Sequence, residues 1–175
     1  MLEGKNIKLR ALEPADVDLL FEWENDKRLW YLSNTLTPFS RFRLEQYVLN
    51  AGNDIFADKQ LRLMIDLVIK TKTDTIGTID MFDYDPHNQR AGLGILIRED
   101  FRNKGYATEA LELIIGYAFN VLNLHQLYCN ISAYNEVSLK LFKKAGFGIS
   151  GQKKEWLFLA QEWVDEYFLQ LIKRR

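Results

Sequence analysis

The chain has 175 residues, a length that suits one domain with a sizeable hydrophobic core. Its net charge of −1 excludes the basic excess of a non-specific nucleic-acid binder. No signal-peptide core and no run of about 18 apolar residues occurs, so we expect a cytoplasmic protein with neither membrane nor nucleic-acid partners. The single cysteine, Cys129, excludes an intramolecular disulfide, and the widely separated His87 and His125 predict no metal site.

The N-terminal segment predicts one short strand and two helices. Apolar and charged residues alternate from Ile7 to Arg10, as in a half-buried strand. Pro14 suits the first position of a helix. Residues 30–39 have no clear period, which predicts a loop. Ser40 can then cap a second helix over residues 41–50.

The middle of the chain is rich in β-forming residues. Three such segments, separated by polar turns, predict an antiparallel meander: residues 61–69, 75–84 and 90–97. The first turn covers residues 70–74 and the second covers residues 85–88. Gly92 and Gly94 weaken the third strand and predict a bulge or a close backbone approach there.

The last third alternates helices and strands. We expect a helix from Tyr106 to about Asn123, a strand over 126–132, a helix over 135–145 ended by Gly146, and a hairpin of strands over 147–158 and 162–171. The aromatic side chains of the hairpin fall at strand spacing, and we expect them to be mainly core residues: Trp156, Phe158, Trp163, Tyr167 and Phe168. The pattern as a whole predicts a single α+β domain over residues 1–175.

The stretch from Phe101 to Leu113 predicts a basic turn that runs directly into a helix. Free backbone N–H groups at a helix N-terminus, together with the helix dipole, favour an anion. Arg102 and Lys104 add positive charge, and Gly105 permits a tight turn. The stretch is typical of a site for the pyrophosphate of a nucleotide-like cofactor, although an ordinary strand-to-helix turn with basic surface residues would have the same composition.

Four segments resemble one family. RNKGYA (102–107) resembles the [QR]-x-x-G-x-[GA] acyl-CoA turn of the GNAT N-acetyltransferase superfamily, and NEVSLKLFKKAGF (135–147) resembles its second motif. The opening segment (7–26) is similar to the branch that acetylates polyamines and ribosomal-protein N-termini, and residues 117–132 resemble its spermidine acetyltransferases. The resemblance covers most of the chain, in the expected order.

The resemblance implies a fold and a reaction. The fold is the GNAT fold, a central mixed, mostly antiparallel sheet of about six to seven strands flanked by about four helices. The reaction is direct transfer of acetyl from acetyl-CoA to a primary amine. A small polyamine-like acceptor is expected, with a protein N-terminus as the alternative and a homodimer as an implied assembly. A CoA-binding module without activity is a third reading of the same sequence.

The resemblance also implies which residues bind the cosubstrate. The pantetheine arm is placed along Ile95, Leu96 and Ile97, and the pyrophosphate on Arg102, Asn103, Lys104, Gly105, Tyr106, Ala107 and Thr108. Asn135 is implied to contact the arm near its thiol end. Asn135 is also a good helix N-cap, with Ser138 three residues later, and both roles can hold together.

The proton donor is where the sequence departs from the family. The Tyr that many members use to protonate the leaving thiolate is replaced by Phe142, which lines the cofactor site but cannot donate a proton. Three hydroxyls lie nearby in sequence, those of Tyr134, Ser138 and Ser132. Ser138 is favoured because it lies one turn into the helix, on the side that should face the thiol. The alternatives are a capping serine and a packing tyrosine.

The base is expected among the acidic strand residues. Asp80, flanked by Ile79 and Met81, should be more buried than Asp83, and the two should point to opposite faces unless a bulge intervenes. Asp80 could accept a proton from the amine and attract a cationic substrate, or it could be a solvent-facing strand residue. Acidic residues near the first loop could serve a polycation or form a solvated helix face: Glu22, Glu24 and Asp26.

Overall fold

The structure is a computed structural model that describes residues 1–30, 35–51, 55–68 and 74–174. The strands are β1 (Leu2–Glu3), β2 (Ile7–Ala11), β3 (Leu61–Leu67), β4 (Thr75–Asp85), β5 (Arg90–Ile97), β6 (Gln126–Ser132), β7 (Gly148–Leu159) and β8 (Glu162–Ile172). The helices are α1 (Val17–Glu24), α3 (Arg41–Asn50), α4 (Ile55–Asp58), α5 (Tyr106–Asn120) and α6 (Glu136–Lys144), with short 3-10 turns η1 (Pro14–Asp16) and η2 (Glu99–Phe101). Most of the predicted turn at 70–74 and part of the predicted loop at 30–39 fall outside the described residues.

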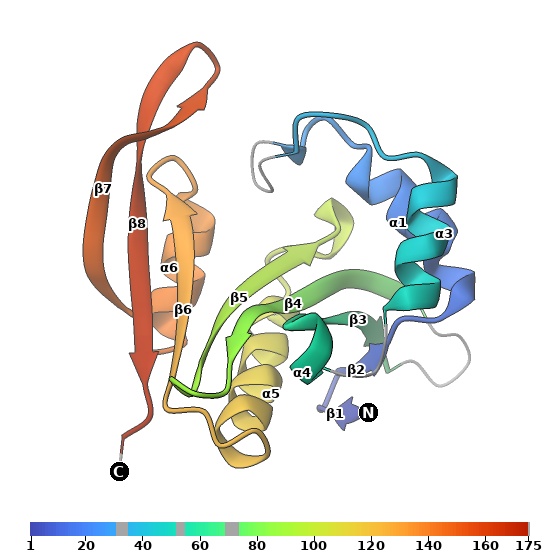
Figure 1. The fold of residues 1–175 in the computed structure, drawn as a ribbon, viewed down its shortest axis with the longest axis horizontal. Coiled ribbons are helices and arrows are strands. Elements are labelled where there is room, and N and C mark those ends of the chain that lie inside the picture. The colour runs from blue at the N-terminus through green and yellow to red at the C-terminus, as the bar shows by residue number, and fades with distance from the viewer. Residues whose placement is uncertain (31–34, 52–54, 69–73, 175) are drawn as a thin grey trace.

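The strands form one mixed sheet in the order β1-β2-β3-β4-β5-β6-β8-β7 (Figure 1). The predicted meander is confirmed, because β3, β4 and β5 pair antiparallel in sequence. The predicted hairpin of β7 and β8 is also present. Of the neighbouring strands that the structure describes, β5 and β6 alone run parallel, as expected for two strands joined by the crossover helix α5. The result is the α+β GNAT fold implied by the resemblance.

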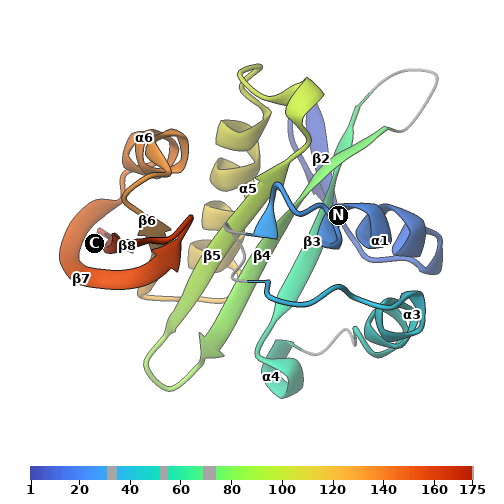
Figure 2. The same cartoon turned by 90° about the horizontal axis from the view of Figure 1, so that it is seen from above.

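Helices cover both faces of the sheet (Figure 2). The apolar side of α5 carries Ala110, Leu111, Ile114 and Ala118, which join the main core with residues from most of the strands. On the opposite face α1 and α3 pack together through a second cluster, Val17, Leu20, Leu44 and Val48. None of the described helices is long and apolar enough to cross a membrane.

The helix ends follow the predicted local chemistry. The Ser40 side chain accepts a hydrogen bond from the Arg43 N–H at 3.1 Å, which caps α3. Asn135 caps α6 in the same way, through the Ser138 N–H at 3.1 Å. Gly146 adopts φ +97°, a left-handed conformation that ends α6 with little strain.

A buried ion cluster joins the N-terminal strand to its neighbours. The Arg10 guanidinium donates to both oxygens of Asp16 at 2.7 and 2.8 Å and to Asp66 at 2.8 Å. Asp16 and Asp66 are almost completely buried. One arginine therefore ties β2, η1 and β3 together through charge-assisted hydrogen bonds.

Three expectations need correction. The described residues contain eight strands and five α-helices rather than about seven and four, since β1 has two residues and α4 has four. Elements this short show no periodicity in a sequence. The hairpin aromatics are also less buried than expected, because Trp156, Phe158 and Trp163 are each more than half exposed. The hairpin extends beyond the helices that would otherwise cover it (Figure 1).

Candidate active site

The sheet divides between β5 and β6. The two strands pair only where Arg90–Gly92 lie beside Gln126–Tyr128, and beyond this point they diverge (Figure 1). β5 remains paired with β4 as far as Ile97, while β6 is paired with β8. The edge of β5 from Leu93 to Ile97 is therefore left without a neighbouring strand on its β6 side among the described residues.

A cavity of about 430 Å³ opens at this division, and we call it the central cavity. Its walls come from α1, β3, β4, β5, β6, α6, β7 and β8. Gly94 of β5 lies opposite Asp80 of β4. A Cβ added at Gly94 would meet only the Phe82 ring, at 3.8 Å, so this glycine leaves space where β5 borders the cavity. Ile95 and Leu96 line the cavity as well, and Ile97 ends the strand.

The basic turn leads from β5 into α5. Gly105 occupies the N-cap with φ +88° and provides no side chain to cap the helix. The first N–H groups of this 15-residue helix, beginning at Tyr106, Ala107 and Thr108, are thus available to an anion. The Arg102 Nε donates to the Ile97 carbonyl at 3.0 Å, and the Lys104 ammonium donates to the Asp100 carbonyl at 2.7 Å. These two side chains close the turn while they keep positive charge beside the helix end. Asn103 adopts φ +60° and continues the tight turn.

Three residues of the second motif line the central cavity: Asn135, Ser138 and Phe142. The Asn135 carboxamide oxygen is engaged by the Ser138 N–H, so its capping role is established by geometry. The Phe142 ring is buried and packs edge-on against Phe147, with 5.2 Å between the ring centroids. Phe142 therefore belongs both to the core and to the cavity wall.

Tyr134 lies outside this arrangement. Its side chain is 60% exposed and does not line the central cavity. The hydroxyl donates to the Glu162 carboxylate at 2.8 Å, and this hydrogen bond raises the pKa of Tyr134. Of the three hydroxyls considered as the thiolate acid, those of Ser138 and Ser132 belong to residues that line the cavity, and that of Tyr134 does not.

Asp80 faces the cavity but is fully engaged. Arg62 of β3 donates to its two oxygens at 2.6 and 3.1 Å, and donates to Glu24 of α1 at 2.6 Å. Burial alone would lower the pKa of Arg62, but Asp80 and its other neighbours outweigh burial and raise it. Arg62 therefore stays charged between two carboxylates, and both oxygens of Asp80 are already occupied by its N–H groups.

The prediction that Asp80 is more buried than Asp83 is confirmed. Asp83 is exposed, whereas the Asp80 side chain is only 19% exposed. A bulge in β4 lies between Phe82 and Asp85, and Asp83 has φ +49° within it. The close approach expected at Gly92 is also present, because a Cβ there would lie 2.2 Å from the Phe82 ring.

Cys129 lines the cavity as a buried residue. Burial raises the pKa of its thiol to about 12. The thiolate that a nucleophile requires is therefore scarce at neutral pH, as expected for a core cysteine.

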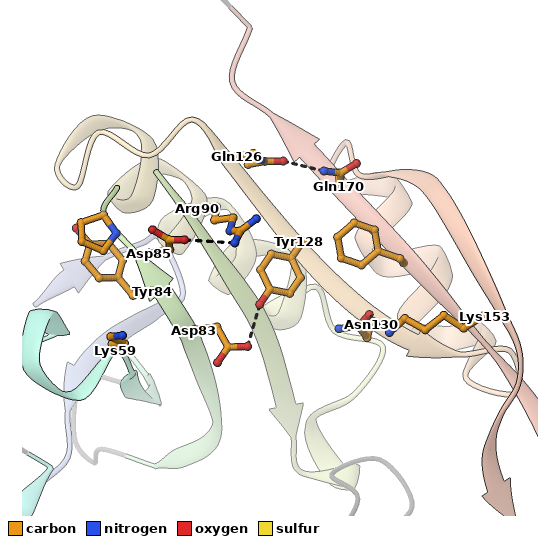
Figure 3. A pocket seen from close by; sticks show the side chains of 12 residues that line it. Lys59, Asp83, Tyr84, Asp85, Arg90, Gln126, Tyr128, Asn130, Lys153 and Gln170 are labelled. Atoms are coloured by element: carbon orange, nitrogen blue, oxygen red, sulfur yellow. Dashed lines mark hydrogen bonds and ion pairs between the residues drawn. The ribbon is translucent and has the colours of Figure 1, made fainter. Parts of the chain in front are cut away.

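A second hollow, of about 700 Å³, is bordered by side chains of β4, β5, β6 and β8 (Figure 3). Many of its polar side chains are already paired: the Tyr128 hydroxyl with Asp83 at 3.0 Å, Arg90 with Asp85 at 3.3 Å, and Gln170 with Gln126 at 2.7 Å. Asn130 borders both spaces. This larger hollow lies away from the basic turn and the second motif, so we place the chemistry in the central cavity.

Sequence reasoning missed two charged residues of the central cavity. Arg62 lies in a strand of mostly apolar residues, and Glu166 lies in an aromatic-rich strand. An isolated charge in such a strand is a signal of a buried pair. Its partner, however, depends on strand register, which a single sequence does not provide.

The comparisons with known proteins agree with this geometry. A family model described as an acetyltransferase (GNAT) domain matches residues 6–148. The uncharacterized N-acetyltransferase p20 of Bacillus licheniformis is 27% identical over 173 residues, 99% of this chain and 96% of its own. The spermidine N(1)-acetyltransferase of Escherichia coli (strain K12) is 26% identical over 164 residues, which are 91% of this chain and 82% of that protein. The putative ribosomal N-acetyltransferase YdaF of Bacillus subtilis is 28% identical over 174 residues, with 98% and 93% covered.

A solved structure has the same fold. The crystal structure of spermidine N-acetyltransferase from Vibrio cholerae in complex with CoA and spermine matches with a TM-score of 0.85 at 21% identity, over 95% of both chains. Since the family model spans most of the sequence, the chain belongs to the GNAT acetyltransferase family and is an N-acetyltransferase that uses acetyl-CoA.

Proposed function

We propose that the protein transfers acetyl directly from acetyl-CoA to a primary amine of a small, polyamine-like acceptor. The charge of the central cavity carries this proposal. Three carboxylates border the cavity, Glu24, Asp80 and Glu166. Two cations are paired with them, the Arg62 guanidinium and the Lys153 ammonium, so one negative charge remains in excess. An excess of negative charge in a partly enclosed space attracts and concentrates a cationic amine. Relatives named as spermidine N(1)-acetyltransferases support the same choice.

The cosubstrate fits the remaining parts of the site. The uncapped N-terminus of α5, with Arg102 and Lys104 beside it, suits a pyrophosphate. The unpaired edge of β5 at Ile95–Ile97 presents backbone groups that suit the amides of a pantetheine arm. Bound there, acetyl-CoA supplies the thioester. The chain itself has to bind the amine, accept its proton and help the thiolate to leave.

Ser138 is the proton donor that we assign to the leaving thiolate. It lines the cavity, and no hydrogen bond of its hydroxyl to another described residue is found, so the hydroxyl is available. Asn135 fixes the first turn of α6 and thereby the position of Ser138. Protonation of a leaving group in the transition state contributes roughly 100-fold to 10,000-fold in rate.

Asp80 acts, in this proposal, through its charge. With both oxygens held by Arg62, it orients the guanidinium and contributes to the negative potential of the cavity. The guanidinium in turn holds Glu24 at 2.6 Å. The three side chains form a fixed wall on the side of the cavity opposite α6.

An acceptor screen that follows release of free CoA tests the proposal. We expect turnover of spermidine and spermine and little turnover of a peptide with a free N-terminus. Selective turnover of the peptide would show that the acceptor is a protein N-terminus rather than a polyamine. Acetyl-CoA binding without turnover of any amine in a broad panel would instead indicate a CoA-binding module.

A further inference from the structure

We propose that Glu166 binds the ammonium group of the acceptor and accepts its proton before acetyl transfer. The inference rests on the N-acetyltransferase activity of the chain and holds for any primary amine. The role of Glu166 can therefore be tested whether or not the acceptor is a polyamine.

Glu166 is the most buried of the cavity carboxylates. The residue is 8% exposed, and it lies in β8 directly opposite Ser132 of β6. Ser132 and Glu166 both line the central cavity, as does Ser138 on α6. The carboxylate therefore shares the cavity with the hydroxyl that we assign to the leaving thiolate.

One oxygen of Glu166 is available. Its Oε2 accepts from the Lys153 ammonium at 2.7 Å, and no hydrogen bond to Oε1 from a described residue is found. Every fully buried polar side-chain atom of the described residues has a partner. The Oε1 atom must therefore be accessible, and the accessible space beside Glu166 is the central cavity.

Lys153 shows that this site accepts an alkylammonium ion. Its ammonium donates to Glu166 at 2.7 Å and to the side-chain oxygen Oδ1 of Asn130 at 3.0 Å (Figure 3 shows Lys153 beside Asn130). The ammonium nitrogen also lies 5.1 Å from the centroid of the Trp156 ring. A primary amine acceptor in its ammonium form has the same chemistry. A lysine ammonium is also a flexible point charge rather than a planar fork, so it can move when a second cation approaches.

The other cavity carboxylates are less suited to accept a proton. Asp80 is held through both oxygens by Arg62, and Glu24 is held by the same guanidinium at 2.6 Å. The bidentate pair with Arg62 occupies both oxygens of Asp80 and fixes its geometry. Glu24 binds the same guanidinium through Oε1. Of the three carboxylates, Glu166 is the one paired with a lysine, and it is also the most buried.

In the proposed reaction the ammonium nitrogen gives one proton to Glu166, which passes that proton to solvent after acetyl transfer. The neutral nitrogen attacks the thioester carbon, an N–C bond forms and the C–S bond breaks. The sulfur takes the hydroxyl proton of Ser138, and Ser138 regains a proton from the acetylated nitrogen, directly or through water. The products are the N-acetylated amine, free CoA thiol and one proton.

The test is Glu166→Gln, which keeps the shape and the hydrogen bond to Lys153 but cannot accept the proton. We expect kcat to fall by about 100-fold or more, with the KM for acetyl-CoA unchanged, and Glu166→Asp to recover part of the loss. Asp165→Asn is the matched control, because Asp165 is the adjacent carboxylate on β8, bonds Gln152 and the Glu155 N–H, and does not line the cavity. Its kcat should stay within twofold of the wild-type value.

The Lys153→Met variant distinguishes a catalytic role of Glu166 from a role in holding Lys153. If Glu166 serves only to hold Lys153, this variant should lose as much activity as Glu166→Gln. We expect it to retain kcat within about fivefold. Spermidine is the first probe; if only another amine in the panel is acetylated, that amine is used, and the polyamine proposal fails while Glu166 is still tested. A Glu166→Gln kcat within twofold of wild type, or equal losses in Glu166→Gln and Lys153→Met, would overturn the assignment.

Discussion

At the scale of single residues, Phe142 is the clearest departure from the usual family arrangement. It is buried against Phe147 at the cavity wall, where it cannot supply a proton. The two hydroxyls nearest in sequence are separated by the fold. Ser138 faces the cavity, whereas the Tyr134 hydroxyl is bound to Glu162 outside it.

Removal of each hydroxyl should therefore have different effects. We expect Ser138→Ala to lower kcat by about 10-fold to 100-fold, since the thiolate must then take its proton from water. Tyr134→Phe should leave kcat within twofold of wild type. Steady-state rates of CoA release measure both, and equal rates in all three proteins would leave the thiolate without an assigned acid.

Two glycines of neighbouring strands, Gly94 of β5 and Gly77 of β4, predict a second contrast. Gly94→Ala places a methyl group in ordinary contact with Phe82 at 3.8 Å, so the fold should tolerate it while the cavity loses volume. We expect a near-wild-type melting temperature and a raised KM for the amine. At Gly77 a Cβ would lie 2.1 Å from the Leu96 carbonyl oxygen. Gly77→Ala should therefore destabilise the fold by on the order of 3 kcal/mol, as measured by urea unfolding.

At the scale of elements, the Arg10 cluster joins β2, η1 and β3 and has a defined pH dependence. Burial alone would raise the pKa of Asp16, but hydrogen bonds from Arg10 and the Glu13 N–H outweigh it, so the pKa lies below its ordinary value. A carboxyl with a lowered pKa stabilises the fold above its unfolded-state pKa, and this stability is lost as the pH falls through the folded-state value.

Asp16→Asn should thus destabilise the protein at pH 7 by on the order of 3 kcal/mol, because it leaves Arg10 partly unpaired. The difference from wild type should begin to narrow as the pH falls below about 4, near the unfolded-state pKa of Asp16, and should continue to narrow as the pH falls toward the lower folded-state pKa. Urea unfolding at pH 7 and pH 3 measures it. Asp18→Asn, which removes an exposed partner of Arg41, is the control and should change stability by less than about 1 kcal/mol. A destabilisation of Asp16→Asn that does not vary with pH would contradict the electrostatic account.

The helices and strands also show how much of the structure can be predicted from the sequence. Long periodic segments and helix caps were predicted correctly, because Ser40, Asn135 and Gly146 act locally. The tight turn before α5 is equally local, and its binding of a pyrophosphate stays a prediction. The partners of Asp80 and Glu166 could not be predicted, because Arg62 and Lys153 meet them across strands whose register is set by the whole sheet. The exposure of Trp156 and Trp163 likewise depends on how far the hairpin extends past its neighbours.

At the scale of the whole molecule, ligand binding should appear as stability. A ligand that binds only the folded state at 100 times its Kd adds about 2.7 kcal/mol, so we expect acetyl-CoA to raise the melting temperature by several degrees. Pantetheine, which lacks the pyrophosphate, should raise the melting temperature much less if the α5 N-terminus binds that group. Equal shifts from both ligands would argue against the basic turn as the pyrophosphate site.

The division between β5 and β6 has a mechanical consequence. Among the described residues, three residue pairs join the two halves of the sheet, Arg90–Gly92 with Gln126–Tyr128. The junction therefore relies more on packed side chains than on backbone hydrogen bonds. A pantetheine arm along β5 would act as a missing strand and stiffen the molecule across its weakest line. In each catalytic cycle, binding of acetyl-CoA would then close the gap beside β5, and release of CoA would open it again.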